Sequence, residues 1–425
     1  MRYRICFVLL LVTATTLHSN RADAQFWKNW FHKKETKRYP AHKPATKAKP
    51  KPSVKKPAAW EYPASVKKTR YRIDFFAPLY LDELIKNNKS VYKGRLPEKA
   101  VTGLDFYEGV KLAADTLNAM GYSIDIYTHD VMQEKETPEW LIAHKVLDSS
   151  DLFIGCVHNN KIPALAAFAR KKNINFISAY SPSDAGITDN PFFVMIQPSL
   201  DVHCSWIMDH IDKKYKGKDP LILYRTIGSL DSEAFAALNA DSSVPRILFN
   251  YYPTKEKLAK NLDSTGTNLV VMPILSVSEA EKILLQLNNW FPNYQFVVYG
   301  MPSWRSMPSI KKPEAFPNIA VYITAPFYFD MSTGPGQALA NMYKQDIGGT
   351  LGEMVFRGYE TTYWFSYLLS KYGTVFNTKF KDDAAAPFTR FDIRQQKNED
   401  GKIMYLENEH IYLYRYQSSS YMVEQ

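Results

Sequence analysis

The sequence predicts an α/β protein in which two doubly wound parallel-sheet lobes follow a basic tail without regular structure. Strand and helix patterns alternate from residue 72 onward, which is typical of a parallel sheet covered by helices. The alternation restarts near residue 200, so two units of similar size are expected in tandem. Several strand candidates, such as LFIGC, are short and apolar throughout, as in strands buried on both faces.

The first unit is organised around a helix and the strand that follows it, between residues 102 and 130. Asp105 is expected to cap the helix, and Glu108 lies three residues later, at the spacing of a capping box. Gly121 follows the last apolar residue of the helix, where a left-handed stop costs glycine least. The other expected elements are strands over 72–79, 124–127, 152–156, 176–179 and 192–196, and helices over 138–147 and 162–172.

The second unit repeats the alternation and then breaks it. The expected helices are 200–215, 229–239, 254–262 and 276–290, and the expected strands are 221–224, 246–252, 268–274, 295–299 and 319–324. Two consecutive helices, 336–347 and 352–372, come next. A β-hairpin over 389–395 and 402–406, turning at Asp400-Gly401, and a strand over 411–416 complete the chain.

Charge is distributed unevenly along the 425 residues. Residues 25–72 hold 15 Lys or Arg against Glu35 and Glu61, a net charge of +13. Since the whole chain is +10 and its first 24 residues are +2, the remainder is −5. A mildly acidic body argues against nucleic-acid binding, which usually requires a basic face.

Residues 1–24 have the pattern of a secretory signal peptide. Arg2 and Arg4 precede an apolar run, and Ala22-Asp23-Ala24 resembles a cleavage site, so the mature chain would begin at Gln25. A buried N-terminal strand is the alternative. The apolar run is too short to cross a bilayer, and no later segment is long enough. A periplasmic location without a transmembrane helix is therefore expected.

Residues 25–71 are expected to form a disordered basic linker rich in Lys and Pro. Its first part, QFWKNWFHKK, could contact a membrane interface as a short amphipathic helix or remain an unstructured, sticky segment. The Lys/Pro-rich remainder cannot bury enough apolar surface to fold and is expected to act as a stiff spacer. It could bind anionic lipid or cell-wall polymer, or serve as a solvated linker with no partner.

The order of elements resembles the type I periplasmic binding proteins, in particular the leucine/isoleucine/valine-binding branch that serves ABC transporters. The segments that carry this resemblance are FYEGVKLAADTLNAMGY, LFIGC with NNKIPALAAFARKKNINFISAYSPSD, FFVMIQPSLDVHCSWIMDHI, GPGQALANMYKQDI, RGYETTYWFSYLL and RFDIRQQKNEDGKIMYLENEHIYLYRY. The resemblance implies a domain over 72–425 whose lobes are joined by three crossings, near Pro198, Phe329 and Gly373. Lobe one would be 72–197 and 334–372, and lobe two 198–329 and 373–425.

Two functions follow from this resemblance. The first is that of an exported solute-binding protein, which closes about a hinge over a small polar or amino-acid-like ligand and presents it to an ABC permease. The second is that of a ligand-free protein of the cell envelope, since the same fold occurs in regulators of cell-wall synthesis. The long tether and a changed first ligand loop favour the second function.

In lobe one, the candidate ligand-binding residues follow two neighbouring strands. The first loop holds His158, Asn159 and Asn160, where family members often have a serine that binds the ligand carboxylate. The second loop keeps hydroxyl groups, which can bind an anionic group without a full charge. Its candidates are Ser178, Tyr180 and Ser181. Each of these residues could instead satisfy its own backbone in a turn.

In lobe two, the candidates are Ser276, Trp304 and Tyr328, each of which follows an expected strand. Trp304 or Tyr328 could close over a ligand as an aromatic wall. Packing in the core or at the surface is the alternative for both aromatic side chains.

No enzymatic activity is expected. The sequence lacks G-x-S-x-G, H-E-x-x-H, G-x-x-x-x-G-K-[ST] and G-x-G-x-x-G, and its 9 histidines have no metal-binding spacing. No cofactor and no metal are therefore expected. Cys156 and Cys204 remain after export, and they could pair in an oxidising compartment or remain inert buried thiols.

Overall fold

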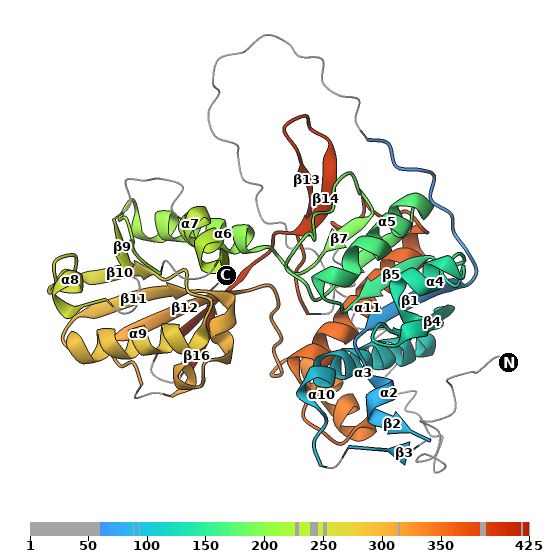
Figure 1. Cartoon of the computed structure of the whole chain (residues 1–425), viewed down its shortest axis with the longest axis horizontal. Coiled ribbons are helices and arrows are strands. Elements are labelled where there is room, and N and C mark those ends of the chain that lie inside the picture. The colour runs from blue at the N-terminus through green and yellow to red at the C-terminus, as the bar shows by residue number, and fades with distance from the viewer. Residues whose placement is uncertain are drawn as a thin grey trace, which may run out of the picture. The chain divides into compact units, whose positions relative to one another are not determined.

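The computed structural model describes residues 60–425 apart from 88, 93, 226–228, 239–244, 250–252, 313–314, 383–387, 418–419 and 425. The expected signal peptide and most of the expected linker lie outside the described residues. The chain divides into two compact units (Figure 1). Unit 1 comprises the described residues up to Gln197 together with Phe329–Asn408, and unit 2 comprises Pro198–Tyr328 and Glu409–Gln425.

Unit 1 is built on a seven-stranded sheet of order β13-β14-β7-β6-β5-β1-β4. Its strands are β1 (Tyr71–Ala77), β4 (Ile124–Asp130), β5 (Leu152–Gly155), β6 (Asn175–Ser178), β7 (Phe193–Met195), β13 (Ile393–Lys397) and β14 (Ile403–Asn408). All neighbours pair in parallel except β13 and β14. The chain reverses its direction of winding between β1 and β5, and open α/β sheets bind ligands beyond the carboxyl ends of strands at such points.

Helices cover both faces of this sheet (Figure 1). On one face lie α3 (Glu98–Ala119) and α11 (Glu353–Tyr372), and Phe75 of β1 stacks on Phe106 of α3 with ring centroids 5.6 Å apart. On the other face, Phe76 and Phe153 pack with side chains of α4 (Pro138–Ala143) and α5 (Ile162–Lys172). The smaller elements of unit 1 are α2 (Leu81–Leu84), β2 (Ile85–Lys86), β3 (Lys89–Ser90), η2 (Glu134–Glu136), η3 (Asn159–Lys161) and α10 (Gly334–Asp346).

The helices α3 and α11 approach each other backbone to backbone. A Cβ atom at Gly109 would lie 2.0 Å from the Val355 carbonyl oxygen, and one at Gly358 would lie 2.2 Å from the Phe106 carbonyl oxygen. Only glycine permits such an approach. The two glycines therefore fix where the buried side chains of α11 lie.

Unit 2 repeats the same winding with a sheet of order β16-β15-β12-β11-β10-β8-β9. Its strands are β8 (Leu221–Arg225), β9 (Arg246–Phe249), β10 (Thr267–Val271), β11 (Gln295–Gly300), β12 (Ile319–Ala325), β15 (Tyr412–Gln417) and β16 (Ser420–Glu424). Its helices are α6 (Leu200–Tyr215), α7 (Ser229–Leu238), α8 (Lys255–Ala259) and α9 (Val277–Trp290), with short turns η4 (Pro302–Ser306) and η5 (Pro308–Lys311). The first five strands are parallel, whereas β15 and β16 pair antiparallel.

The predicted α/β class and the two tandem parallel sheets are confirmed, but the expected start of the first helix is wrong. The helix α3 begins at Glu98 after Pro97, so Asp105 lies inside the helix and does not cap it. The hydroxyl of Tyr343 donates to the Glu108 carboxylate over 2.8 Å. Glu108 therefore has a tertiary partner in place of the expected capping box.

The closing hairpin also differs from its expected place, because it belongs to unit 1. β14 pairs in parallel with β7, with Leu406 beside Val194 and Glu407 beside Met195. The third passage between the units therefore lies after Asn408 and not near Gly373.

Residues 60–70 were expected to belong to the disordered linker, but they lie along unit 1. We call this segment the strap. The Trp60 ring lies 4.4 Å from the Arg170 guanidinium, and the Ser65 hydroxyl donates to the Tyr372 carbonyl over 2.7 Å. Lys68 forms an ion pair with Asp151. The strap therefore belongs to the folded part of the chain.

None of the helices in the described part of the chain combines the length and the hydropathy needed to cross a bilayer.

Candidate functional site

The loops that follow β5 and β6 line a pocket in unit 1. Both strands are parallel and adjacent, so their carboxyl ends meet at one edge of the sheet. The pocket has a volume of about 390 Å³ and is lined by His158, Asn159, Asn160, Tyr180, Ser181 and Pro182. The structure thus brings together four of the five candidates predicted for this lobe.

Hydrogen bonds and ring contacts join the two loops across the pocket. The Ser181 hydroxyl donates to Asn159 Oδ1 of the first loop, and within the second loop the Ser183 N–H donates to Ser181 Oγ over 3.1 Å. The rings of His158 and Tyr180 meet edge to face at 5.3 Å. The lining side chains offer amide, hydroxyl and imidazole groups, which suit a small polar ligand.

Ser178 precedes the second pocket loop in the sequence. It is the last residue of β6 and is fully buried, and its Oγ has no hydrogen-bond partner among the described residues. It does not belong to the pocket lining.

The three candidates of unit 2 have different environments. Ser276 is the exposed residue before α9, with its hydroxyl 3.3 Å from that of Ser278. Tyr328 is half-buried against Tyr412 and Tyr414. Trp304 is fully buried and donates from Nε1 to the Ile274 carbonyl over 2.6 Å. The structure therefore gives Trp304 the alternative role of core packing, and the idea of an aromatic wall at this residue is wrong.

A residue in the loop after β1 was not predicted from the sequence. Tyr80 has φ 56° and ψ 35°, a left-handed conformation that is uncommon for a bulky side chain. The Asp130 carboxylate holds the surrounding loop by accepting from the N–H groups of Leu79 over 2.9 Å and Leu81 over 2.8 Å. The sequence does show that Asp130 ends an expected strand region. It contains no local pattern that would pair this aspartate with a loop about 50 residues earlier.

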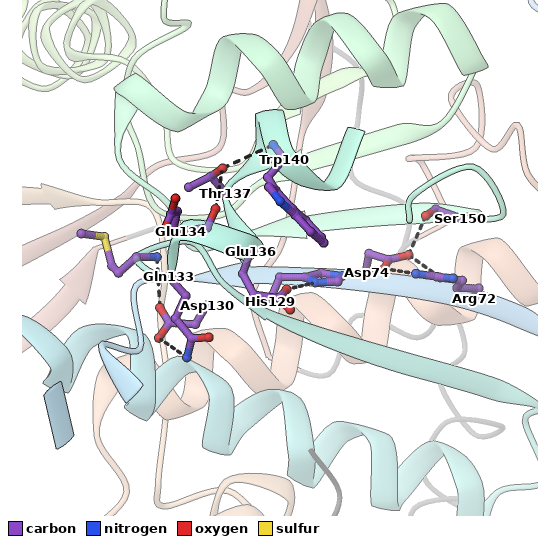
Figure 2. Close-up of polar contacts among 11 residues, drawn as sticks. Arg72, Asp74, His129, Asp130, Gln133, Glu134, Glu136, Thr137, Trp140 and Ser150 are labelled. Atoms are coloured by element: carbon purple, nitrogen blue, oxygen red, sulfur yellow. Dashed lines mark hydrogen bonds and ion pairs between the residues drawn. The ribbon is translucent and has the colours of Figure 1, made fainter. Parts of the chain in front are cut away.

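A buried network of charged side chains lies on the α4 side of the sheet (Figure 2). His129 contacts Asp74 through Nε2 over 2.8 Å and Glu136 through Nδ1 over 2.7 Å. Asp74 also accepts from Arg72 over 2.7 Å and from the Ser150 hydroxyl over 2.6 Å. Both ring nitrogens of His129 are therefore occupied by carboxylates, which leaves neither free to act as a general base on a substrate.

Opposing effects set the ionisation of this network. Burial would lower the pKa of His129, but hydrogen bonds to Asp74 and Glu136 outweigh it and raise the pKa above its ordinary value. Burial would raise the pKa of Asp74, but hydrogen bonds from His129, Arg72 and Ser150 outweigh it and lower the pKa. The raised pKa of His129 and the lowered pKa of Asp74 both favour an imidazolium paired with two carboxylates.

Cys156 and Cys204 are both free and buried, and burial raises the pKa of each thiol to about 12. Within the described ranges, no three His, Cys, Asp or Glu side chains come together as a metal site.

Comparisons with known proteins show the fold. No protein-family model matches the sequence, and no curated protein matches it. The structure is similar to that of a putative branched-chain amino acid ABC transporter from Rhodospirillum rubrum, with a TM-score of 0.59 and 13% identity over 84% of this chain and 100% of that one. The two mixed, mainly parallel sheets are those of the type I periplasmic binding protein fold.

Two further solved structures share this fold. One is a branched chain amino acid ABC transporter periplasmic ligand-binding protein from Burkholderia xenovorans, with a TM-score of 0.55 and 14% identity over 84% of this chain and 95% of that one. The other is full-length LpoA from Haemophilus influenzae, with a TM-score of 0.55 and 12% identity over 85% of this chain. The chain spans 60% of LpoA.

Proposed function

We propose that this protein, which has the fold of the ABC-transporter binding proteins, binds a small polar ligand in the pocket beyond β5 and β6. The observation that carries this proposal is the pocket itself, at the carboxyl ends of two parallel strands. Ligands of open α/β sheets bind at such strand ends. Asn159, Asn160, Tyr180 and Ser181 would supply the polar contacts.

The finer proposal is that the ligand is amino-acid-like and that the protein serves an ABC permease after export to the periplasm. The names of the similar proteins from Rhodospirillum rubrum and Burkholderia xenovorans support this reading. Within unit 2, Ser276 and Tyr328 stay candidate ligand contacts, because each follows the carboxyl end of a strand in its own sheet.

Native mass spectrometry of the mature protein, purified from its own envelope, tests the proposal. A discrete small mass that is lost on denaturation would support it and would give the mass of the ligand. Asn159→Ala and Ser181→Ala should each weaken binding about tenfold, since each removes a polar contact. Asn118→Ala, an exposed change on α3, serves as the matched control. A protein without a bound mass, and without stabilisation in thermal shift by a broad panel of small polar metabolites that includes the amino acids, would refute the proposal.

A ligand-free role in the cell envelope is the second candidate. The observation that favours it is the hydrogen bond from Ser181 to Asn159, through which the two loops satisfy each other. If the protein carries no ligand, envelope proteins recovered by cross-linking in the native cell would identify its partner.

A further inference from the structure

A single buried arginine lies between the pocket and the point where the chain leaves unit 1. Arg357 is on α11, and its side chain is 8% exposed. Its Nη2 donates to the Ala179 carbonyl over 2.7 Å and to Gln197 Oε1 over 2.9 Å. Ala179 directly precedes the pocket residues Tyr180 and Ser181, and Gln197 is the last residue before unit 2 begins.

The position of Arg357 is set by the packing of α11, not by the loop that it holds. Gly358 is the next residue, and it brings α11 against the backbone of α3. The backbone next to Arg357 is therefore held against α3, and the guanidinium donates from one nitrogen to two separate segments. A buried cation is costly unless its hydrogen bonds are kept. The Glu353 carboxylate lies 3.7 Å from Nη1, whereas the Ala179 carbonyl and the Gln197 side chain are neutral acceptors that share Nη2.

Further hydrogen bonds join the exit segment, residues 196 and 197, to the end of β6 and to the end of β14, where the chain leaves unit 1 a second time. The Ile196 N–H donates to the Ser178 carbonyl over 3.1 Å, directly beside the pocket loop. The side chain of Asn408, the last residue of unit 1, donates to the Ile196 carbonyl over 3.3 Å. The end of β6, the first exit from unit 1 at Gln197 and the second exit at Asn408 thus belong to one continuous set of contacts.

We propose that Arg357 is a positioning residue that couples the pocket loop at 179–182 to the exit segment at Gln197. The inference rests on the proposed function, because it assigns a use to the same pocket. A ligand that displaces Tyr180 or Ser181 moves the Ala179 carbonyl. Arg357 cannot follow that carbonyl and also keep Gln197, so occupancy of the pocket changes how the exit segment is held.

Hydrogen exchange measured by mass spectrometry on the mature, ligand-free protein tests this coupling. The peptides of interest contain Ala179 and Ile196, whose amides are hydrogen-bonded. Arg357→Met should raise exchange about tenfold in both peptides, as expected for the loss of a charge-assisted bond. Glu353→Gln, which leaves both Nη2 bonds in place, is the control and should change neither peptide.

Gln197→Ala provides the readout that separates coupling from local support. If Arg357 couples the two segments, this change should also raise exchange at Ala179, because the Ala179 carbonyl and the Gln197 side chain accept from the same Nη2 atom. Exchange that rises only around Ile196 would overturn the proposal. A rise throughout unit 1 in Arg357→Met, including β1 and β4, would overturn it as well, because it would show general destabilisation.

A ligand experiment distinguishes failure of this inference from failure of the proposed function. The probes are the standard L-amino acids, measured by calorimetry on wild type and Gln197→Ala. If no probe or native ligand binds wild type, the proposed function fails, while the exchange result still decides the coupling. If a probe binds with the same affinity to both proteins and leaves exchange at Ile196 unchanged in wild type, the inference alone is overturned.

Discussion

His129 shows how one side chain ties the stability of unit 1 to pH. It is buried between Asp74 and Glu136, and its pKa is raised by the hydrogen bonds to these carboxylates against the effect of burial. A histidine with a raised pKa in the folded state stabilises fully below its unfolded value of about 6.5. That stabilisation is lost as the pH rises through the folded-state value.

Replacing His129 should remove this dependence. We expect His129→Gln to lower the free energy of unfolding by about 3–5 kcal/mol at pH 6, since it leaves Asp74 with one partner fewer in a buried site. Wild type should lose stability as the pH rises above about 6.5, and we expect His129→Gln to lack this decline. Urea denaturation between pH 5.5 and 9 measures both effects. His144→Gln, at an exposed position on the surface, is the control. Parallel curves for wild type and His129→Gln would contradict the assignment.

The buried carboxyl group of Glu360 predicts a second dependence of stability on pH. It is fully buried in α11, and burial raises its pKa to about 7 although Thr389 and Phe388 donate hydrogen bonds to it. As the pH rises, Glu360 ionises in the unfolded chain before it ionises in the folded protein. The free energy of unfolding should therefore fall between about pH 4.3 and about pH 7. Glu360→Gln keeps the acceptor oxygen and should be more stable than wild type at pH 8, by on the order of 3 kcal/mol.

The comparison at pH 4 and pH 8 is decisive for Glu360. At pH 4, wild type and Glu360→Gln should have similar free energies of unfolding, because both side chains are neutral. A variant that is equally destabilised at both pH values would show that the carboxyl group is needed for geometry alone.

Some site residues could be predicted from sequence, and others could not. Asn159 and Ser181 follow neighbouring strands, and the strand order alone brings them together. Trp304 follows a strand in the same way, but its ring packs over Gly300 and is withdrawn into the core. Asp74 and His129 are 55 residues apart, and Arg357 reaches back 178 residues to Ala179. No local pattern contains such pairings.

At the scale of elements, the α3–α11 pair should tolerate no side chain at its closest point. Gly358→Ala would bring a Cβ atom within 2.2 Å of the Phe106 carbonyl oxygen. We expect a loss of about 1–3 kcal/mol or more in the free energy of unfolding, as for overpacked cores. Gly352→Ala is the matched control. Gly352 lies just before the same helix, and a Cβ atom there would be 4.0 Å from its nearest neighbour, an Asp105 carboxylate oxygen. Equal denaturation midpoints for the two variants would refute this view of the packing.

The strap should contribute measurably to unit 1. Tyr62 packs edge to face on Phe192 with centroids 5.8 Å apart, and Val66 exchanges hydrogen bonds with Thr374. A chain that begins at Tyr71 should melt several degrees below one that begins at Trp60, because each lost hydrogen bond is worth about 1 kcal/mol. Calorimetry compares the two chains. Ser65→Ala in the longer chain should lower the melting temperature by part of the same amount. Identical melting curves for the two chains and the variant would show that the strap does not stabilise unit 1.

Most elements could be predicted because their apolar periodicity is strong. The expected helix over 162–172 matches α5, and that over 200–215 matches α6. The strap was not predicted, because its Lys and Pro composition is that of a linker and its partners lie in distant segments. The place of the hairpin β13–β14 was wrong for a related reason: its pattern gives two strands but not the sheet that they join.

At the scale of the whole molecule, each unit has its own sheet and core. All strands of the unit 1 sheet come from the described residues before Pro198 and from Phe329–Asn408. We therefore expect unit 1 to fold alone when residues 60–197 are joined to 329–408 by a Gly/Ser linker. Circular dichroism should show a cooperative thermal transition with near-ultraviolet signal. A chain with secondary structure but no near-ultraviolet signal would show that unit 1 depends on unit 2.

The place of β14 has a consequence for the order in which the chain is made. As a nascent chain emerges from its N-terminus, β1 to β7 are present early, whereas β14 follows only after the whole first segment of unit 2. Until then β7, with its fully buried residues Phe193, Val194 and Met195, is an uncovered sheet edge. Such edges pair readily with other chains. The growing chain would therefore be most prone to aggregate during the interval between the synthesis of β7 and that of β14, when a holding chaperone would help most.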